Sequence, residues 1–156
     1  MHIKSQQRNW TMGAFVTILN RSNRILCVRQ RYSKRNWTTP GGRIEDGEDP
    51  VEALRRETRE EVGLNITNVR FTGIYWKSYA RDLVFSFAAN SKLDDFTFKA
   101  NSEISDAAFF DISNLPSPMR ANTRLRIEHA ATRVAAQLTI FRTPTRYRVI
   151  AGDRSA

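Results

Sequence analysis

The chain has a single cysteine among its 156 residues, so no disulfide can form within it. Cys27 sits in the apolar run at residues 25–28, where a small buried side chain is favoured over a reactive thiol. A chain that uses no disulfide suits a reducing compartment, and we expect a cytoplasmic protein.

Long apolar runs are also missing. No stretch reaches the roughly 20 apolar residues that a membrane-spanning helix needs, and the first seven residues carry no apolar run of the signal-peptide kind. Repeats, low-complexity tracts and linkers are absent as well. We therefore expect one soluble domain over residues 1–156, with its core at about 10–140, a frayed end at 151–156 and no membrane partner.

Acidic residues are the scarcer charge, with 16 Asp and Glu against 25 Lys and Arg, for a net charge of +9. A basic balance attracts polyphosphates and nucleic acids, although scattered arginines are equally typical of a solvated surface. The acidic residues are not scattered. Eight of the sixteen lie between Glu45 and Glu61, which suggests that they act together.

The apolar residues that are present support a mixed fold with a real core. Hydrophobic residues make up 40% of the chain and include nine Phe. Apolar runs predict strands at 13–19, 24–29, 68–76, 82–89, 96–99 and 107–111, a helix at 50–62, a second helix at about 123–138 and a further strand within 139–150. This order predicts an α/β (α+β) fold, an α/β/α sandwich with a central mixed sheet.

The helix at 50–62 has clear start and stop signals. Asp49 is suited to cap it, Pro50 fits its first turn, and Glu52 completes a capping box. Gly63 stands where a left-handed residue usually ends a helix. One face, which we expect to pack on the sheet, carries Val51, Leu54, Thr58 and Val62.

Three glutamates, Glu57, Glu60 and Glu61, stand at i, i+3 and i+4 on one edge of this helix. One interpretation is a solvated face, with Arg56 and Arg59 as ion-pair partners. The other is a divalent cation site, because hard cations such as Mg²⁺ take oxygen ligands. The residues upstream favour the second interpretation: the loop at 41–48 begins with paired glycines, which allow close backbone approach, and it feeds a helix N-terminus that attracts anions.

Loop and helix together follow the spacing Gly, five residues, Glu, seven residues, Arg-Glu-apolar-x-Glu-Glu-x-Gly-apolar. This pattern resembles the Nudix box of MutT-like hydrolases at its seven fixed identities, which chance would produce at roughly one in a billion start points. They are Gly42, Glu48, Arg56, Glu57, Glu60, Glu61 and Gly63. One residue departs from the family pattern, because Thr58 stands where an apolar side chain is usual. The resemblance covers most of residues 12–117.

The resemblance implies roles for these residues. Glu57, Glu60 and Glu61 would ligate Mg²⁺, with Mn²⁺ as a substitute and the Gly42 carbonyl as a further oxygen. Glu48 and Arg56 would brace each other and hold the loop against the helix.

Glu103 lies outside the box. It matches the place where MutT-like members carry an additional loop carboxylate that binds metal or activates water. For the general base, Glu57 is the first choice and Glu103 the second.

The implied function is Mg²⁺-dependent hydrolysis of a diphosphate bond in a nucleoside diphosphate derivative: an NTP, a nucleotide sugar or a dinucleoside polyphosphate. A second hypothesis is an RNA 5′ pyrophosphohydrolase, because a net charge of +9 suits a polyanionic RNA substrate. A non-catalytic nucleotide-sensing domain is a third, disfavoured because every box glutamate is present.

The arginines between Arg120 and Arg154 are the candidate RNA contacts, Arg126 among them. Their spread argues against a single groove, so a small nucleotide is preferred as partner over RNA. A homodimer is compatible with the sequence. Trp37 and Phe109 are interpreted as core residues and not as platforms for a base.

Overall fold

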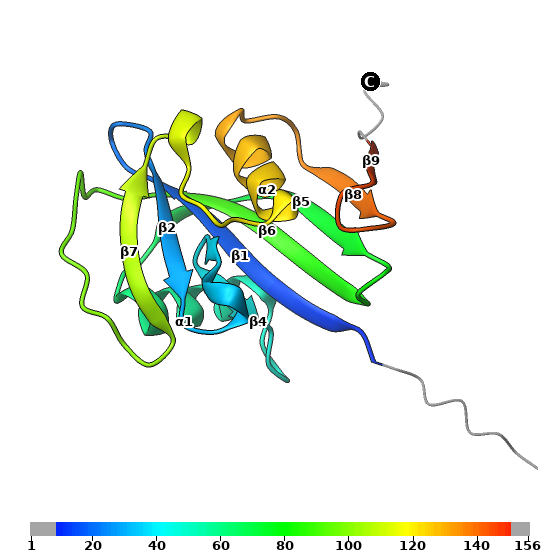
Figure 1. Ribbon diagram of the computed structural model, residues 1–156, viewed down its shortest axis with the longest axis horizontal. Helices are drawn as coiled ribbons and strands as arrows, with labels where there is room; N and C mark the ends of the chain where they lie inside the picture. The colour runs from blue at the N-terminus through cyan, green and yellow to red at the C-terminus, as the bar shows by residue number, and fades with distance from the viewer. Residues whose placement is uncertain (1–8, 151–156) are drawn as a thin grey trace, which may run out of the picture.

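The computed structural model describes residues 9–150 of the chain, so the frayed end expected at 151–156 lies outside the described residues. Figure 1 shows a mixed sheet with one helix on each side. In chain order the elements are β1 (Thr11–Leu19), β2 (Ile25–Gln30), the 3₁₀ turn η1 (Ser33–Arg35), β3 (Trp37–Thr38), β4 (Gly41–Arg43), α1 (Pro50–Val62), β5 (Thr67–Lys77), β6 (Asp82–Asn90), β7 (Ile104–Phe110), the 3₁₀ turn η2 (Ile112–Asn114), α2 (Ala121–Ala131), β8 (Gln137–Phe141) and β9 (Tyr147–Ile150).

β1 is the central strand of the sheet. It pairs in parallel with β6 over nine positions, from Thr11 opposite Asp82 to Leu19 opposite Asn90. Its other edge receives β4 and the end of β2, both antiparallel. Outward from β6, the order continues through β5 and β8 to β9, while β7 pairs with β2. Parallel and antiparallel pairs therefore mix, as predicted.

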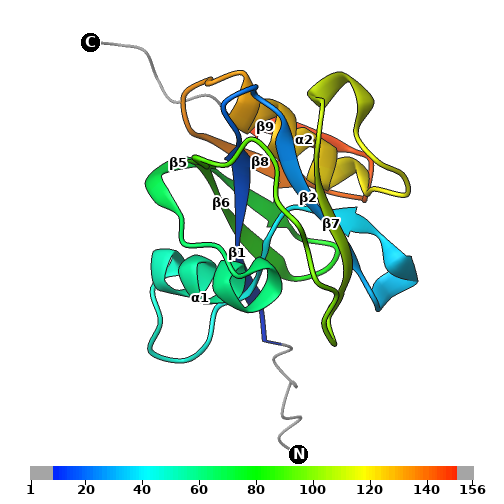
Figure 2. The same cartoon turned by 90° about the vertical axis from the view of Figure 1, so that its left-hand side faces the viewer.

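The alternation of side chains along β1 and β2 divides the core between the two helices, which lie on opposite faces of the sheet (Figures 1 and 2). Val16 and Leu26 pack with Leu54 of α1. On the other face, Ile25 and Cys27 pack with Ile127 of α2. The predicted α/β/α sandwich is confirmed.

Helix α1 begins and ends at the predicted residues. The Asp49 carboxylate accepts hydrogen bonds from the amides of Val51 and Glu52, and the Glu52 carboxylate accepts one from the Asp49 amide. Gly63 closes the helix with a φ of 69°. The family departure at Thr58 costs little, because its buried hydroxyl donates to the Leu54 carbonyl at 2.7 Å.

Several predicted elements differ from the structure, and residues 41–43, expected as part of a loop, form strand β4. No strand forms at 96–99, where Phe96 and Phe98 pack against the core as an irregular segment. The Asp95 carboxylate accepts a hydrogen bond from the Phe96 amide. The second helix ends at Ala131 and not near residue 138, because residues 137–141 pair in parallel with β5 as strand β8. The single strand expected within 139–150 is replaced by β8 and β9. None of the described helices combines the length and the apolar character needed to cross a membrane.

Candidate active site

The paired glycines of β4 lie directly beside the acidic edge of α1. A Cβ on Gly42 would sit 2.6 Å from the carboxylate carbon of Glu57, so any larger residue would displace that side chain. The Gly41 amide donates to the buried Glu61 carboxylate at 3.0 Å. Glycine is required at both positions because backbone and carboxylates share the space that a side chain would fill.

Three carboxylates converge at this point. Oxygen atoms of Glu57, Glu61 and Glu103 all lie within 4.8 Å of one another. Glu103 arrives from the loop before β7, and Asn101 holds that loop in place. The Asn101 side-chain amide donates to the Glu61 carbonyl and accepts from the Glu103 amide, both at 3.0 Å. The proximity that the resemblance implied for Glu103 is thus present.

Glu60 stands apart from this group. Its side chain is 54% exposed and pairs with Arg56 at 3.2 Å. The fourth expected ligand, the Gly42 carbonyl oxygen, lies close to β1. A Cβ added at Gly13 of that strand would be 3.2 Å from this oxygen. Of the four ligands expected from the sequence, the structure brings Glu57 and Glu61 together and adds Glu103.

Arg56 joins the loop to the helix. Its guanidinium contacts both oxygens of Glu48, at 2.6 and 3.1 Å, and donates to the Arg43 carbonyl at 3.1 Å. Another nitrogen reaches Glu57 at 3.0 Å. The hydrogen bonds that Arg56 donates to Glu48 lower the pKa of Glu48, and the same bonds raise the pKa of Arg56. The bracing geometry implied by the resemblance is therefore found between Glu48 and Arg56.

Burial makes charge costly in this cluster. It raises the pKa of Glu61 to about 8, against the hydrogen bond from Gly41, and the charges of Glu57 and Glu103 add to the rise. Burial also raises the pKa of Glu57, although Arg56 opposes this. A cation bound between the carboxylates would relieve both desolvation and mutual repulsion. Because every ligand atom is an oxygen, the site fits a hard divalent cation.

Tyr32 and Gln30 extend the site beyond the carboxylates. Burial raises the pKa of the Tyr32 hydroxyl, and the negative charges of Glu61, Glu103 and Glu57 add to the rise. Gln30 donates to that hydroxyl at 3.4 Å. Neither residue was identified from the sequence, because the polar segment after β2 carries no motif.

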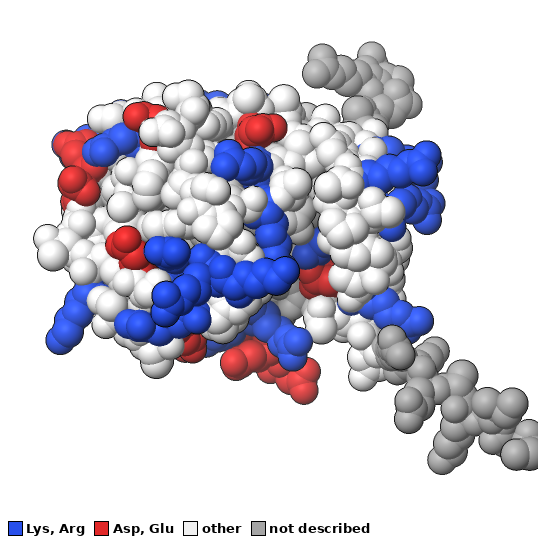
Figure 3. Space-filling view, viewed as in Figure 1, with Lys and Arg blue, Asp and Glu red and all other residues white. Residues whose placement is uncertain are grey.

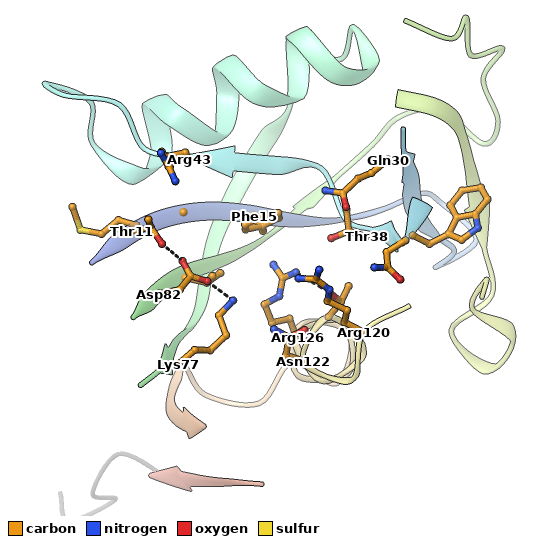
Figure 4. Close-up of a pocket in the computed structure, with 16 residues that line it drawn as sticks. Thr11, Phe15, Gln30, Thr38, Arg43, Lys77, Asp82, Arg120, Asn122 and Arg126 are labelled. Atoms are coloured by element: carbon orange, nitrogen blue, oxygen red, sulfur yellow. Dashed lines mark hydrogen bonds and ion pairs between the residues drawn. The ribbon is translucent and has the colours of Figure 1, made fainter. Parts of the chain in front are cut away.

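Gln30 also lines a cavity of about 240 Å³ on the α2 side of the sheet. Figure 4 shows α2 below this cavity, β1 and β4 above it, and the Arg126 guanidinium reaching from α2 toward Phe15. Arg126 is 5% exposed. Its place among candidate RNA contacts was therefore wrong, because a side chain buried beneath a small cavity cannot join an exposed groove. The labelled lining residues are Thr11, Phe15, Gln30, Thr38, Arg43, Lys77, Asp82, Arg120, Asn122 and Arg126.

Basic side chains also gather outside the cavity. Figure 3 shows Lys and Arg atoms spread over η1 and the adjoining end of β2. Arg120 belongs to the same region, since it donates to Ser33 of η1 at 2.8 Å. The other basic residues of the segment, all exposed or half-buried, are Arg29, Arg31, Lys34 and Arg35.

The aromatic residues and the thiol take the places expected of core residues. Trp37 and Phe109 are 7% and 6% exposed, so both are confirmed as core. Cys27 is fully buried, and burial raises the pKa of its thiol to about 12, which leaves it protonated and unreactive at neutral pH.

Comparison with known proteins adds family information to this geometry. A family model described as NUDIX domain matches residues 10–130. A putative 8-oxo-dGTP diphosphatase of Bacillus subtilis is 41% identical over 73 residues, which are 47% of this chain and 48% of that protein. An RNA pyrophosphohydrolase of Mannheimia succiniciproducens is 39% identical over 66 residues, which are 41% of this chain and 33% of that protein. The chain thus spans less than half the length of these curated relatives.

Solved structures share the fold. A NUDIX hydrolase from Nitrosomonas europaea superposes with a TM-score of 0.74 at 19% identity, covering 86% of this chain and 80% of that one. At that identity the likeness concerns the arrangement of strands and helices and not the substrate.

Proposed function

Because the chain belongs to the NUDIX domain family, we propose that it is a metal-dependent hydrolase that cleaves a diphosphate bond in a nucleoside diphosphate derivative. The observation that carries the proposal is the group formed by Glu57, Glu61 and Glu103 beside the glycine backbone of β4. A domain that only senses nucleotides has no need for three carboxylates held at such a cost in burial and repulsion.

The carboxylates of Glu57, Glu61 and Glu103 would hold Mg²⁺, or Mn²⁺ in its place. Glu60 would join them after leaving Arg56, and the Gly42 carbonyl is a further oxygen donor. A bound cation of this kind neutralises phosphate oxygens and lowers the pKa of water beside them. Glu48 contributes indirectly, since it orients Arg56 and thereby the loop.

The proton of the attacking water needs an acceptor within hydrogen-bond reach. We propose Glu57 as that acceptor, with Glu103 as the second candidate. Glu57 is half-buried, its pKa is raised, and Arg56 holds one of its oxygens in place. Glu103 is the exposed member of the cluster, so a substrate and its attacking water can reach it.

The activity is tested by a panel of NTPs, nucleotide sugars, dinucleoside polyphosphates and triphosphorylated RNA, assayed for phosphate or pyrophosphate release. Hydrolysis is expected with Mg²⁺, and EDTA should abolish it. Full activity in metal-free buffer, or no hydrolysis of any panel member, would contradict the proposal.

The two base candidates separate in the same assay. Loss of the general base lowers kcat even at saturating Mg²⁺. Loss of a metal ligand raises the Mg²⁺ concentration that gives half-maximal activity. Glu57→Gln and Glu103→Gln should be compared on this criterion. Glu128→Gln, an exposed carboxylate on α2 outside the cluster, is the matched control and should keep wild-type activity.

RNA with a 5′ triphosphate is the second candidate substrate. The basic surface over η1 favours it, because exposed Lys and Arg side chains near the carboxylate cluster suit a chain of phosphates (Figure 3). A small nucleotide remains our first choice, since the partly open cavity of about 240 Å³ that Gln30 lines accommodates part of one nucleotide and no continuous strand.

A further inference from the structure

The cavity on the α2 side of the sheet has a strong excess of positive charge among its lining residues. Four of its lining residues are cationic, Arg43, Lys77, Arg120 and Arg126, and one is acidic, Asp82, which leaves an excess of three positive charges. Asp82 is already engaged, because it forms an ion pair with Lys77 and accepts a hydrogen bond from Thr11 at 2.8 Å (Figure 4). The remaining guanidinium groups have no comparable acid facing them among the lining residues.

Arg126 is the most deeply buried of these four cations. Its side chain is 5% exposed and lies over the ring of Phe15, with 4.4 Å from the guanidinium carbon to the ring centroid. One terminal nitrogen donates to the Thr123 hydroxyl at 3.3 Å. The other, Nη1, is buried and has no hydrogen-bond partner within residues 9–150. Burial lowers the pKa of Arg126 to about 10, so the group still carries its charge at neutral pH.

A buried, charged donor without an acceptor is destabilised by the loss of its hydration, and a ligand that supplies the acceptor recovers much of that loss. Charge-assisted hydrogen bonds are about twice as strong as neutral ones, so an anion satisfies Nη1 better than a carbonyl does. Asn122 adds a polar group to the same wall, since its amide oxygen is also buried without a partner. That oxygen suits a hydroxyl donor, such as a sugar hydroxyl beside the anion.

The cavity offers poor accommodation for an uncharged base. A base commonly stacks on an open aromatic face. The face of Phe15 is covered by Arg126, and Trp37 is nearly fully buried, with Phe110 packed edge-on against it. Little aromatic surface is therefore open for a base to stack on.

Arg43 connects the cavity to the proposed reaction centre. It lines the cavity and directly follows Gly42, which lies against the Glu57 carboxylate. Gln30 lines the cavity as well and donates to the Tyr32 hydroxyl at 3.4 Å. One substrate can therefore reach both places, with its diphosphate at the carboxylates and its far end against Arg126.

We propose that this cavity binds a second anionic group of the substrate, a phosphomonoester or a carboxylate separated from the diphosphate that is cleaved. The inference rests on the proposed function for its role in catalysis, but the anion site itself can be tested without turnover. Arg126 is then the residue that selects substrates carrying such a group, and Arg120 at the rim assists it.

The first test measures anion binding in protein freed of metal by a chelating resin, so that the carboxylates cannot hold phosphate through a cation. Inorganic phosphate should raise the melting temperature of the wild-type protein saturably, relative to potassium chloride at equal ionic strength. Arg126→Met should abolish this shift, and Arg120→Gln should raise the phosphate concentration needed severalfold. Arg148→Gln, on the exposed strand β9, is the matched control and should respond as wild type does.

Folding of the variants does not confound this test. Without phosphate, Arg126→Met should melt at or above the wild-type temperature, because an apolar side chain of similar length replaces a buried charge that lacks a full set of partners. Arg120→Gln changes an exposed residue and leaves the core intact. A phosphate response equal in wild type, Arg126→Met and Arg120→Gln, or no saturable response in wild type, would overturn the proposal.

The second test compares substrates that differ by one anionic group. NADPH differs from NADH by a phosphomonoester, and UDP-glucuronate differs from UDP-glucose by a carboxylate, so the two pairs also distinguish the two kinds of anion. In at least one pair, kcat/KM should favour the anionic member by about tenfold or more in the wild type, as one charge-assisted hydrogen bond implies. The preference should disappear in Arg126→Met.

The outcomes separate this proposal from the proposed function. If phosphate binds at Arg126 but no diphosphate is hydrolysed, the hydrolase assignment fails and the anion site stands. If hydrolysis proceeds without preference in either pair, the anion proposal fails and the hydrolase stands. Arg126→Met could instead change the preference among GTP, ATP and CTP and leave the NADPH/NADH and UDP-glucuronate/UDP-glucose preferences unaffected. The cavity would then bind a base, and the proposal would be overturned.

Discussion

Glu61 should make the metal-free protein less stable as the pH rises. The carboxyl is 3% exposed, and burial raises its pKa to about 8 from an ordinary value of 4.5. The folded protein therefore holds this proton more tightly than the unfolded chain does. Stability contributed by the protonated form is fully present below pH 4.5 and is lost progressively as the pH rises toward 8.

The size of the effect follows from the shift in pKa. At 1.36 kcal/mol for each pKa unit, the loss in the free energy of unfolding reaches about 5 kcal/mol above pH 8, as an upper limit. Typical domains are stable by about 5–15 kcal/mol, so a loss of this size would be easy to measure. Glu57 contributes in the same direction, since its pKa is also raised.

Urea denaturation of metal-free protein between about pH 5 and pH 9 tests this reasoning. Glu61→Gln removes the titrating group while keeping the shape, so the variant should lose much less stability over this range than the wild type. The difference between the two proteins isolates Glu61 from Glu48, whose lowered pKa acts in the opposite sense at acid pH. Parallel pH profiles for wild type and variant would refute the reasoning.

Mg²⁺ should reverse the effect in the wild type. A cation between the carboxylates favours their charged forms, so its stabilisation of the folded state should grow as the pH rises from 6 to 8. For each proton that binding releases, the gain should be about 1.36 kcal/mol for every pH unit. Glu61→Gln should gain far less from Mg²⁺ at every pH. Stabilisation by Mg²⁺ that is independent of pH would show that the cation binds elsewhere.

Three further predictions concern the loop, the bracing pair and the substrate. Gly42→Ala should reduce Mg²⁺-dependent turnover by orders of magnitude, because the added Cβ would lie 2.6 Å from the carboxylate carbon of Glu57; wild-type kinetics in this variant would contradict the site. Glu48→Gln should raise the Mg²⁺ concentration for half-maximal activity about 10- to 100-fold by releasing Arg56, and an unchanged Mg²⁺ titration would show that the pair serves only stability. Across a salt series, log affinity for triphosphorylated RNA should fall by about 0.7 per phosphate contact for each decade of salt, with a shallower slope for a mononucleotide. A higher kcat/KM for the RNA that collapses with salt would reverse our preference for a small nucleotide.

The parts that could be predicted from the sequence are those with local causes. Helix α1 was predicted to the residue because Asp49, Pro50, Glu52 and Gly63 act within one turn of its ends. The resemblance to the family box likewise implied that Glu48 and Arg56 meet, as they do. The end of α2 was misplaced because residues 137–141 form hydrogen bonds with β5, some 60 residues earlier in the chain. The local sequence pattern of a helix does not show that such a distant partner exists.

The cavity and its lining residues could not be predicted from local sequence patterns. Arg126 is one of many arginines in its region, and nothing in its neighbours marks it as buried. Its position follows from the packing of α2 over Phe15 of β1, a contact between segments more than 100 residues apart. Asn101 was missed for the same reason, since its bond to Glu61 bridges 40 residues.

The parallel pairing of β1 with β6 has a consequence for how the chain assembles. Thr11 and its partner Asp82 are separated by 71 residues, so at common rates of synthesis the first strand waits on the order of several seconds for its neighbour. Helix α1 lies within that interval, and helices form in about a microsecond. We expect the glutamate-bearing helix, supported by its own caps, to form transiently long before the sheet that it rests on, and the late closure of β1 against β6 to limit the rate of folding.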